Sequence, residues 1–117
     1  MRIGVDLGGT KTEIIVLDKQ GVQRYRKRVK TDTKTYDTMV RTICGLVREA
    51  ESSMGIKGTL GVGIPGTISA VTGMVKNANT TILNGHALDR DLGNILDRKV
   101  RCANDANCLA LSEAVDG

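Results

Sequence analysis

The first thirty residues carry an alternating apolar pattern that predicts three short strands. Ile3, Val5 and Leu7 are apolar at every second position, two glycines then interrupt the pattern, and an apolar run resumes at 14–17. Such alternation is typical of strands with one buried face, and strands this close together form an antiparallel meander. The predicted strands cover about residues 2–7, 13–18 and 22–30, with a turn at 19–21.

The pattern then changes to the spacing of a helix. Apolar residues follow one another at intervals of 3, 1, 3, 4, 3 and 4, which places them on one helical face. Thr33 or Thr35 can cap the start of this helix, and Gly55 can end it. The apolar face consists of Tyr36, Met39, Val40, Ile43, Val47, Ala50 and Met54.

The remaining elements alternate between strand and helix, which predicts an α/β protein. Residues 59–66 are typical of a buried strand that enters a loop, and a polar, Asn-rich ribbon follows at 74–85. A short amphipathic helix over 88–96 and a strand over 100–103 come next. A final helix opens at 104–107, so the predicted order is β-β-β-α-β-ribbon-α-β-α.

Composition indicates a single cytoplasmic domain. The length of 117 residues suits one domain over 1–117, and its core must be aliphatic because the chain has no Trp or Phe. No apolar run is long enough to span a membrane, and the N-terminus enters a strand without a secretory signal pattern. Three cysteines without CxxC spacing indicate free thiols in a reducing compartment. We therefore expect a cytoplasmic protein with no membrane partner.

The net charge of +4 gathers partly on the third predicted strand. A basic strand can bind nucleic acid, but the chain has few aromatic residues for stacking and no nucleic-acid-binding motif. Basic residues also guard an exposed edge strand against pairing with another chain. We favour the guard and expect no nucleic-acid partner. The residues concerned are Arg24, Arg26, Lys27, Arg28 and Lys30.

The glycine turn between the first two strands carries groups that can bind the phosphates of a magnesium nucleotide. Gly8 and Gly9 allow unusual backbone angles and leave the N–H groups of the turn open to a phosphate. Asp6, at the end of the first strand, can hold hydrated Mg²⁺ through an oxygen contact. An ordinary β-hairpin with a glycine turn remains the alternative. Hydroxyl groups and a cation come from Thr10, Thr12 and Lys11.

A second candidate site follows the strand at 100–103. Asn104 and Asp105 stand where this strand ends and a helix begins, and ligands gather at this end of the strands in open α/β sheets. A carboxylate there can accept the proton that a sugar hydroxyl loses as it attacks phosphorus. The alternative is that one of the two residues simply caps the helix.

Six segments of the chain together resemble the ROK family of sugar kinases, within the actin/hexokinase/Hsp70 superfamily. The resemblance covers essentially the whole chain and is closest to the fructokinase or mannokinase branch. It implies an RNase H-like lobe, with a mixed five-stranded sheet (an antiparallel three-strand meander plus two parallel strands) and helices on both faces. The segments are Asp6-Leu7-Gly8-Gly9-Thr10-Lys11, Pro65-Gly66, Lys76-Asn77-Ala78-Asn79, Leu83-Asn84-Gly85, Ala103-Asn104-Asp105-Ala106-Asn107-Cys108 and Glu113-Ala114.

The resemblance also implies a role for each candidate residue, with ATP and Mg²⁺ as cofactors. Asp105 matches the catalytic base, and Asn104 is similar to the residue that hydrogen-bonds the sugar beside it. Gly66 and Asn79 stand where the family contacts sugar hydroxyls. The hairpin that binds the ATP phosphates is matched by Gly8, Gly9, Thr10, Lys11 and Thr12, and the Mg²⁺-facing acid by Asp6.

The chain departs from the family at its end. ROK kinases continue with a second glycine-rich phosphate loop, a Glu-x-Gly-His stretch, a Cys-rich zinc motif and an adenine-binding lobe, none of which occurs in residues 1–117. We therefore expect the N-terminal lobe of a two-lobed enzyme, inactive alone and prone to self-association where the missing C-terminal lobe would cover it. His86, the only histidine, is expected to be a solvated loop residue and not a zinc ligand. A homodimer is a further expectation, because dimers are common in the family.

The favoured function is ATP-dependent phosphorylation of a hexose, with fructose as the first candidate. Glucose, mannose and N-acetylated hexosamines follow, because several sugar contacts of the family lie beyond residue 117. A ROK-type repressor that senses sugar is an alternative, but such proteins carry a helix-turn-helix before the lobe, whereas this chain starts at its first strand and keeps the Gly8-Gly9 turn and Asp105. A non-catalytic binding module is the third hypothesis.

Overall fold

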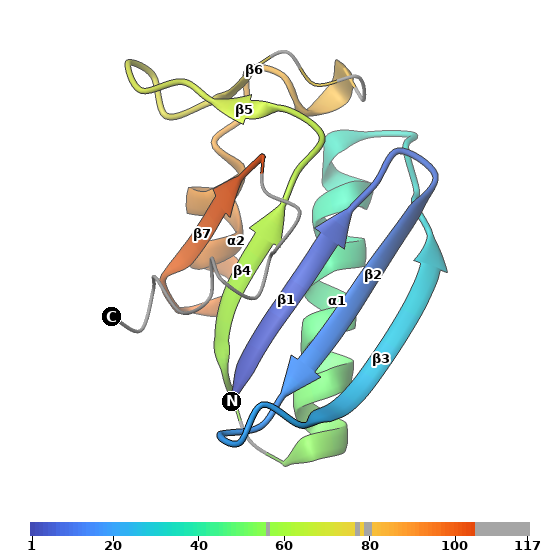
Figure 1. Cartoon of the computed structure of the whole chain (residues 1–117). Helices are drawn as coiled ribbons and strands as arrows, with labels where there is room; N and C mark the ends of the chain where they lie inside the picture. The colour runs from blue at the N-terminus through green and yellow to red at the C-terminus, as the bar shows by residue number, and fades with distance from the viewer. Residues whose placement is uncertain (56, 77, 79–80, 105–117) are drawn as a thin grey trace.

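A computed structural model describes residues 1–55, 57–76, 78 and 81–104, and it contains a five-stranded sheet with helices packed on one face (Figure 1). The strand order is β3-β2-β1-β4-β7, antiparallel among β1, β2 and β3 and parallel from β1 through β4 to β7. This confirms the predicted meander extended by two parallel strands. The strands are β1 (Arg2–Leu7), β2 (Lys11–Leu17), β3 (Gln23–Lys30), β4 (Thr59–Gly63) and β7 (Val100–Ala103).

Strand β2 begins at Lys11, two residues before its predicted start. Thr12 pairs with Leu7 on β1 and with Val29 on β3, so the ladder continues up to the turn. The Thr12 side chain is fully buried, at a position where the alternating pattern requires an inward residue. Because threonine is polar, the apolar pattern alone places the start of the strand too late.

Helix α1 (Tyr36–Met54) forms where the apolar spacing predicts it. Thr35 caps its start, since its side-chain oxygen accepts a hydrogen bond from the Thr38 N–H. Gly55 ends it with a left-handed backbone (φ 75°), which side chains disfavour. The structure therefore selects Thr35 over Thr33 as the cap.

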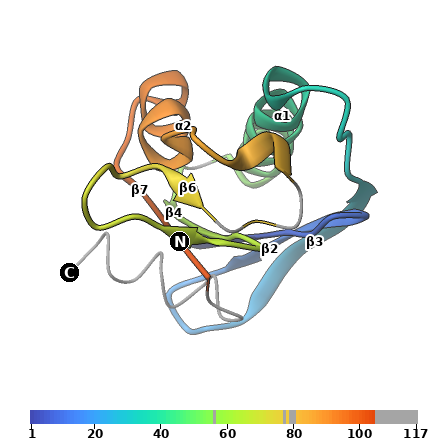
Figure 2. The ribbon, with the colours of Figure 1, turned by 90° about the horizontal axis from the view of Figure 1, so that it is seen from above.

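Helix α2 (Leu88–Leu96) lies beside α1 on the same face of the sheet (Figure 2). Its first turn carries two acids, Asp89 and Asp91, as the positive end of a helix dipole favours. The expectation of helices on both faces is not tested by these two helices, and the final predicted helix falls mostly within 105–117, outside the described residues. Neither α1 nor α2 is long and apolar enough to cross a bilayer, and no other helix in the described ranges is.

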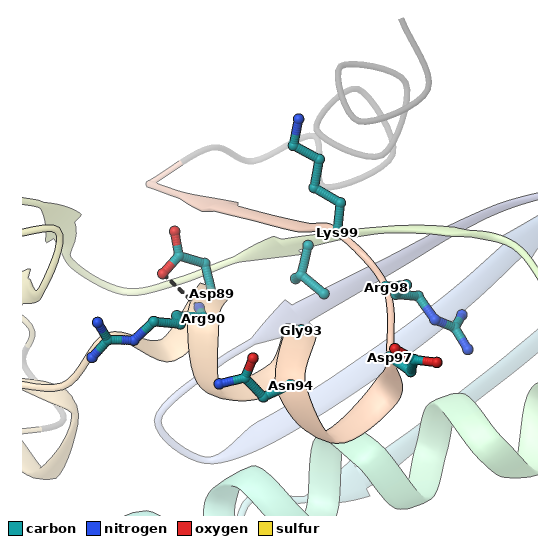
Figure 3. A pocket seen from close by; sticks show the side chains of 8 residues that line it. Asp89, Arg90, Gly93, Asn94, Asp97, Arg98 and Lys99 are labelled. Carbon is teal, nitrogen blue, oxygen red and sulfur yellow. Dashed lines mark hydrogen bonds between the residues drawn. The ribbon is translucent and has the colours of Figure 1, made fainter.

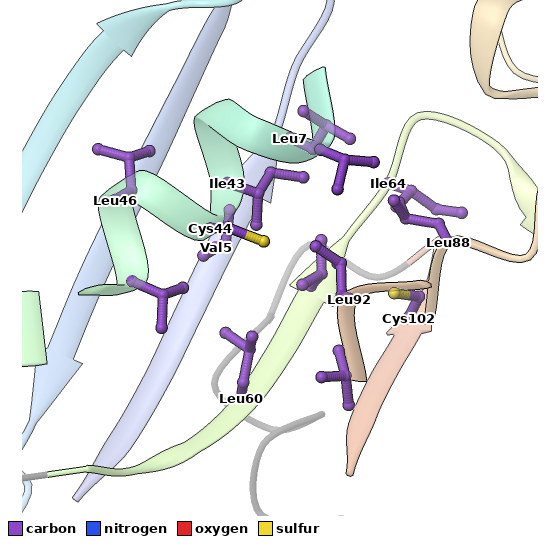
Figure 4. Close-up of a cluster of buried hydrophobic side chains, with 14 of the residues drawn as sticks. Val5, Leu7, Ile43, Cys44, Leu46, Leu60, Ile64, Leu88, Leu92 and Cys102 are labelled. Atoms are coloured by element: carbon purple, nitrogen blue, oxygen red, sulfur yellow. The ribbon is translucent and has the colours of Figure 1, made fainter. Parts of the chain in front are cut away.

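The core fills the space between this face of the sheet and the two helices (Figure 4). Its side chains are aliphatic, as the scarcity of aromatic residues requires. Cys44 and Cys102 belong to this core, and burial raises the pKa of both thiols, so they pack as small apolar side chains. Its fully buried members include Ile3, Val5, Ile14, Val16, Met39, Ile43, Leu60, Val62, Leu88 and Leu92.

A short ribbon of β5 (Thr67–Ile68) and β6 (Val75–Lys76) lies beyond the carboxyl ends of β4 and β7 (Figure 1). A 3₁₀ turn, η1 (Thr81–Leu83), follows and leads into the loop before α2. The Asn84 side chain bonds both backbone groups of Ala78: Oδ1 accepts from the N–H at 3.0 Å, and Nδ2 donates to the carbonyl at 3.4 Å. Asn84 therefore holds the backbone of Ala78 in place.

Strand β3 lies at the edge of the sheet, and four of its basic side chains, those of Arg24, Arg26, Lys27 and Arg28, form ion pairs. Arg26 and Arg28 contact Glu13 on β2 at 3.1 and 3.0 Å, and Lys27 contacts Glu49 on α1 at 2.6 Å. These contacts join β3 to its neighbours. The interpretation that the basic residues guard an exposed edge stays a prediction.

Candidate active site

The sheet brings the described candidate residues to one edge. Asp6 lies opposite Gly63 in the parallel pairing of β1 with β4, and Gly63 lies opposite Ala103 in the pairing of β4 with β7. The Ile64 N–H also donates to the Ala103 carbonyl at 3.0 Å. The end of β1 and Asn104 therefore share the carboxyl edge of three adjacent strands, which is where ligands bind in open α/β sheets.

Two of the expected site residues lie outside the described part of the chain. Asp105, the expected base, follows Asn104 in the sequence, and Asn79, an expected sugar contact, follows Ala78. Their roles stay predictions that rest on the family resemblance.

The turn between β1 and β2 is bare and exposed, as a phosphate site requires. The Gly8 N–H donates to the Lys11 carbonyl at 3.0 Å, which closes the turn. Gly9, Thr10 and Lys11 are exposed, and the N–H groups of Gly9 and Thr10 have no acceptor among the described residues. Two backbone donors, a hydroxyl and an ammonium group are thus available on the turn, a set that suits phosphate oxygens.

The need for glycine in this turn comes from crowding. A Cβ atom on Gly8 would lie 2.5 Å from the Lys11 carbonyl oxygen, too close for any real contact. Neither Gly8 nor Gly9 lies in the left-handed region, so the crowding at Gly8, and not a left-handed backbone, accounts for the glycine there. The left-handed glycines of the described chain are Gly21, Gly55, Gly73 and Gly85.

Thr12 differs from the other turn candidates because its side chain points into the molecule. The residue is fully buried, and its hydroxyl oxygen lies 2.8 Å from that of Thr31, just after β3. Thr10 and Lys11, in contrast, are exposed. Thr12 therefore makes a supporting contact beneath the turn, and direct contact of its hydroxyl with a phosphate stays a prediction.

Asp6 is exposed at the end of β1 and has a second acid beside it, Glu13, directly opposite on β2. Burial works to raise the pKa of Glu13, but hydrogen bonds and charges from Arg26 and Arg28 outweigh it, so the pKa lies below its ordinary value. Glu13 is thus ionised and neutralised by two guanidinium groups. Asp6 has no ion-pair partner among the described residues, so its charge is free to meet a cation.

Asp6 fits the needs of Mg²⁺ in a nucleotide complex. No group of three His, Cys, Asp or Glu side chains that could hold a metal occurs in the described part of the chain. Mg²⁺, however, usually keeps several waters and is bound by one or two carboxylates together with substrate phosphates. One exposed carboxylate beside a bare phosphate turn suffices for that arrangement.

Gly66 packs tightly against the chain that leaves the ribbon. A Cβ atom there would lie 2.8 Å from the Lys76 carbonyl oxygen and 2.9 Å from the Ala78 Cβ. The absence of a side chain lets the loop after β4 approach this segment closely. Gly66 therefore lies directly against Lys76 and Ala78.

Asn104 is exposed just after β7 and lines an open hollow of about 600 Å³. Thr67 and Ile68 of β5 and Arg101 of β7 also line it. This volume is in the range of small-molecule sites. Sequence reasoning missed Thr67, although a hydroxyl directly after Gly66 was a signal that could have found it.

A second hollow, of about 450 Å³, follows α2 to the turn before β7 (Figure 3). Its lining is mostly charged and polar, and no residue expected from the sequence to bind sugar or nucleotide belongs to it. Asp89, Lys99 and Val100 line both hollows, so this hollow adjoins the one beside Asn104. Its polar lining consists of Asp89, Arg90, Asn94, Asp97, Arg98 and Lys99.

His86 packs against another ring. Its imidazole stacks on the Tyr36 ring, with centroids 3.7 Å apart and planes 8° apart. Burial and the hydrogen bond that the Tyr36 hydroxyl donates to Asp91 raise the pKa of Tyr36. His86 lies in the loop before α2 and is half-buried, so the expectation of a solvated loop residue holds only in part. Its stack on Tyr36 was not predicted, because a contact between residues so far apart leaves no pattern in the sequence.

Comparison with known proteins assigns the chain to a family. Residues 2–117 match the ROK family. The chain belongs to the ROK family. Sugar kinases of the ROK family are its relatives in sequence and in structure, and they confirm the lobe of the actin/hexokinase/Hsp70 superfamily inferred from the sequence.

Three relatives illustrate the similarity of this ROK chain to known kinases. The N-acetyl-D-glucosamine kinase of Yersinia enterocolitica is 44% identical over 99% of this chain. A ROK family glucokinase from Streptomyces griseus, in complex with glucose and AMPPNP, superposes with a TM-score of 0.77 and 29% identity, covering 91% of this chain and 33% of its own. An inorganic polyphosphate/ATP-glucomannokinase from Arthrobacter sp. strain KM superposes with a TM-score of 0.72 and 30% identity. The match covers 99% of this chain and 48% of the glucomannokinase. The chain spans 38% of the length of the curated relatives it matches.

Proposed function

We propose that this chain is the N-terminal lobe of a kinase that transfers the γ-phosphoryl group of Mg-ATP to a hydroxyl of a hexose. The observation that carries the proposal is the shared edge, where the bare turn, the exposed Asp6 carboxylate and Asn104 lie at the ends of adjacent strands. An edge of this kind can hold a nucleotide and an acceptor side by side. Its sugar-kinase relatives support the same reaction.

N-acetyl-D-glucosamine is the first candidate for the acceptor. The motifs of the chain led us to expect fructose, but the relatives favour another hexose. An N-acetyl-D-glucosamine kinase is 44% identical to this chain, and a structurally similar ROK kinase was solved with glucose. We therefore rank N-acetyl-D-glucosamine first and glucose second, ahead of mannose and fructose.

On the nucleotide side, each group of the turn has a task. The exposed N–H groups of Gly9 and Thr10 bind the terminal phosphates of ATP, and Lys11 balances their negative charge. Asp6 holds Mg²⁺ through water. When bound, this ion neutralises the charge that develops on the phosphoryl oxygens.

On the acceptor side, the roles rest on the family resemblance. Gly66, Asn79 and Asn104 fix the sugar hydroxyls, and Asp105 accepts the proton of the attacking hydroxyl. An ordinary carboxyl pKa is sufficient for this base, because most of the catalysis comes from positioning and charge neutralisation.

Turnover by the full-length gene product that contains this chain tests the proposal. ATP consumption is measured with N-acetyl-D-glucosamine, glucose, mannose and fructose, for the wild type and for Asp105→Asn. We expect turnover of N-acetyl-D-glucosamine or glucose, and a loss of at least about a hundredfold in kcat for Asp105→Asn. Asp97→Asn is the matched control, because it makes the same change at an exposed left-handed position (φ 53°) that asparagine accepts.

Two outcomes would contradict the proposal. Sugar binding without turnover of any hexose would indicate a sensor or a binding module, with Asp105 as a helix cap. Turnover that persists in Asp105→Asn would support the kinase activity but refute the role of Asp105 as its base.

A further inference from the structure

We infer that Thr31 positions the phosphate-binding turn through its hydroxyl group. The inference rests on the proposed function, because it concerns the same nucleotide site. Thr31 follows β3 and is far in sequence from the turn, yet it bonds three different residues of the β1–β2 hairpin. None of these bonds leaves a pattern in the sequence.

The hydrogen bonds form a chain with a defined direction. The Thr31 hydroxyl donates to the Gly8 carbonyl at 2.8 Å, and its oxygen lies 2.8 Å from the Thr12 hydroxyl oxygen. A hydroxyl has one proton to donate. Since Thr31 gives its proton to Gly8, Thr12 must be the donor in the second bond. A further bond joins the Thr31 N–H to the Thr10 carbonyl at 2.8 Å.

The chain of hydroxyl groups is shielded from water. Thr12 is 0% exposed and Thr31 is 6% exposed. Consecutive hydrogen bonds strengthen one another in such a site, and a partner lost there is not readily replaced by solvent. The Gly8 carbonyl is therefore held in one direction.

The direction of the Gly8 carbonyl decides where the next N–H points. In a trans peptide the C=O and the following N–H point in opposite directions, and no cis peptide occurs among the described residues. Because Thr31 draws the Gly8 carbonyl toward a buried hydroxyl, the Gly9 N–H points away from it. That N–H has no acceptor among the described residues, and Gly9 is exposed. Thr31 thus aims a backbone donor at the expected phosphate without touching the ligand itself.

Thr31→Val tests this role, because valine keeps the shape of threonine and loses only its hydroxyl. The Gly8 carbonyl and the Thr12 hydroxyl then lose their shared partner. In the full-length gene product, we expect the Kd for a non-hydrolysable ATP analogue and the KM for ATP to rise roughly tenfold. The KM for the sugar should stay within about twofold, because Thr31 bonds none of the residues that are expected to contact the sugar. Thr31→Ser keeps the hydroxyl and should restore the nucleotide affinity.

Thr42→Val is the matched control. The Thr42 hydroxyl donates to the Thr38 carbonyl at 2.9 Å within α1, so the same substitution removes a comparable bond away from the turn. Its nucleotide affinity should equal that of the wild type. If Thr31→Val does not fold, Thr31→Ala carries the same expectation, and thermal unfolding of each variant identifies a general loss of structure.

The outcomes separate this inference from the proposed function. Wild-type nucleotide binding that Thr31→Val and Thr31→Ala do not weaken would overturn the inference alone. An equal loss of nucleotide and sugar affinity would also overturn it, since that result indicates general destabilisation. A wild-type protein that binds no nucleotide would overturn the proposed function and this inference with it.

Discussion

Gly8 and Gly45 should respond in opposite ways to the same substitution. A Cβ atom on Gly8 would lie 2.5 Å from the Lys11 carbonyl oxygen, whereas one on Gly45, exposed within α1, meets nothing within 4 Å. Gly8→Ala must therefore open the turn, and we expect the Kd for an ATP analogue to rise at least about tenfold. Calorimetric titration of the full-length protein measures this change.

Gly45→Ala is the control for that experiment. Alanine is the better helix former, so the substitution should stabilise the protein by about 0.5–1 kcal/mol and leave nucleotide affinity unchanged. Thermal unfolding measures the gain. An unchanged affinity in Gly8→Ala would mean that the turn does not contact the nucleotide.

What the sequence reveals about a single residue depends on how local its contacts are. Gly55 acts within one turn of α1, so its role could be predicted from the sequence. Thr31 meets Gly8, and His86 stacks on Tyr36, across separations that carry no periodic signal. Contacts of this kind follow only from the three-dimensional arrangement.

At the scale of elements, the fold could be predicted wherever one face of an element is buried. The meander and α1 each bury a regular apolar stripe, which fixes both their type and their inward face. The site could be predicted as far as the strand ends, because parallel strands bring their carboxyl ends to one edge. The packing of Gly66 and the bonds of Asn84 to Ala78 could not be predicted, since a polar stretch does not reveal which side chains bond the backbone.

One buried ion pair joins three elements at the end of the sheet opposite the site. The guanidinium of Arg98, before β7, donates to both carboxylate oxygens of Glu51 on α1 at 2.7 Å. Gly58, before β4, donates to Glu51 at 2.9 Å and accepts from Arg98 at 3.0 Å. Glu51 is 9% exposed, so its carboxylate depends on these partners.

Glu51→Gln should destabilise the protein by roughly 3 kcal/mol, because it leaves the Arg98 charge buried without its partner. Urea denaturation of the full-length protein measures the loss. Glu49→Gln is the matched control: it removes the same charge from α1 at a half-exposed side chain, so its effect should be small. Equal losses in the two variants would contradict a special role for the buried pair.

The same pair makes stability depend on pH. Burial works to raise the pKa of Glu51, but hydrogen bonds from Arg98 and Gly58 outweigh it and hold the pKa below its ordinary value of 4.5. The Glu51 carboxylate is therefore protonated less readily in the folded protein than in the unfolded chain. The stabilisation that this carboxylate contributes is complete above pH 4.5 and is lost as the pH falls through the lowered pKa. Below pH 4.5 the free energy of unfolding should fall less steeply in Glu51→Gln than in the wild type.

At the scale of the whole molecule, the candidate groups lie on an open edge. Asp6, Lys11 and Asn104 are exposed, and the hollow beside Asn104 is open to solvent. Phosphoryl transfer to a sugar requires a site from which water is excluded, and kinases of this kind reach that state by closing two lobes. On the proposed function, the closing surface comes from parts of the gene product beyond this lobe.

The isolated 117-residue chain should therefore phosphorylate sugar far more slowly than the full-length gene product. Without the closing surface the acceptor and phosphate are poorly aligned, so we expect kcat/KM at least about a hundredfold lower. Circular dichroism of the isolated chain must first show that it folds, and the Asp105→Asn full-length variant supplies the background rate. Comparable turnover by the two proteins would mean that this edge alone completes the site, and the need for a second lobe would be refuted.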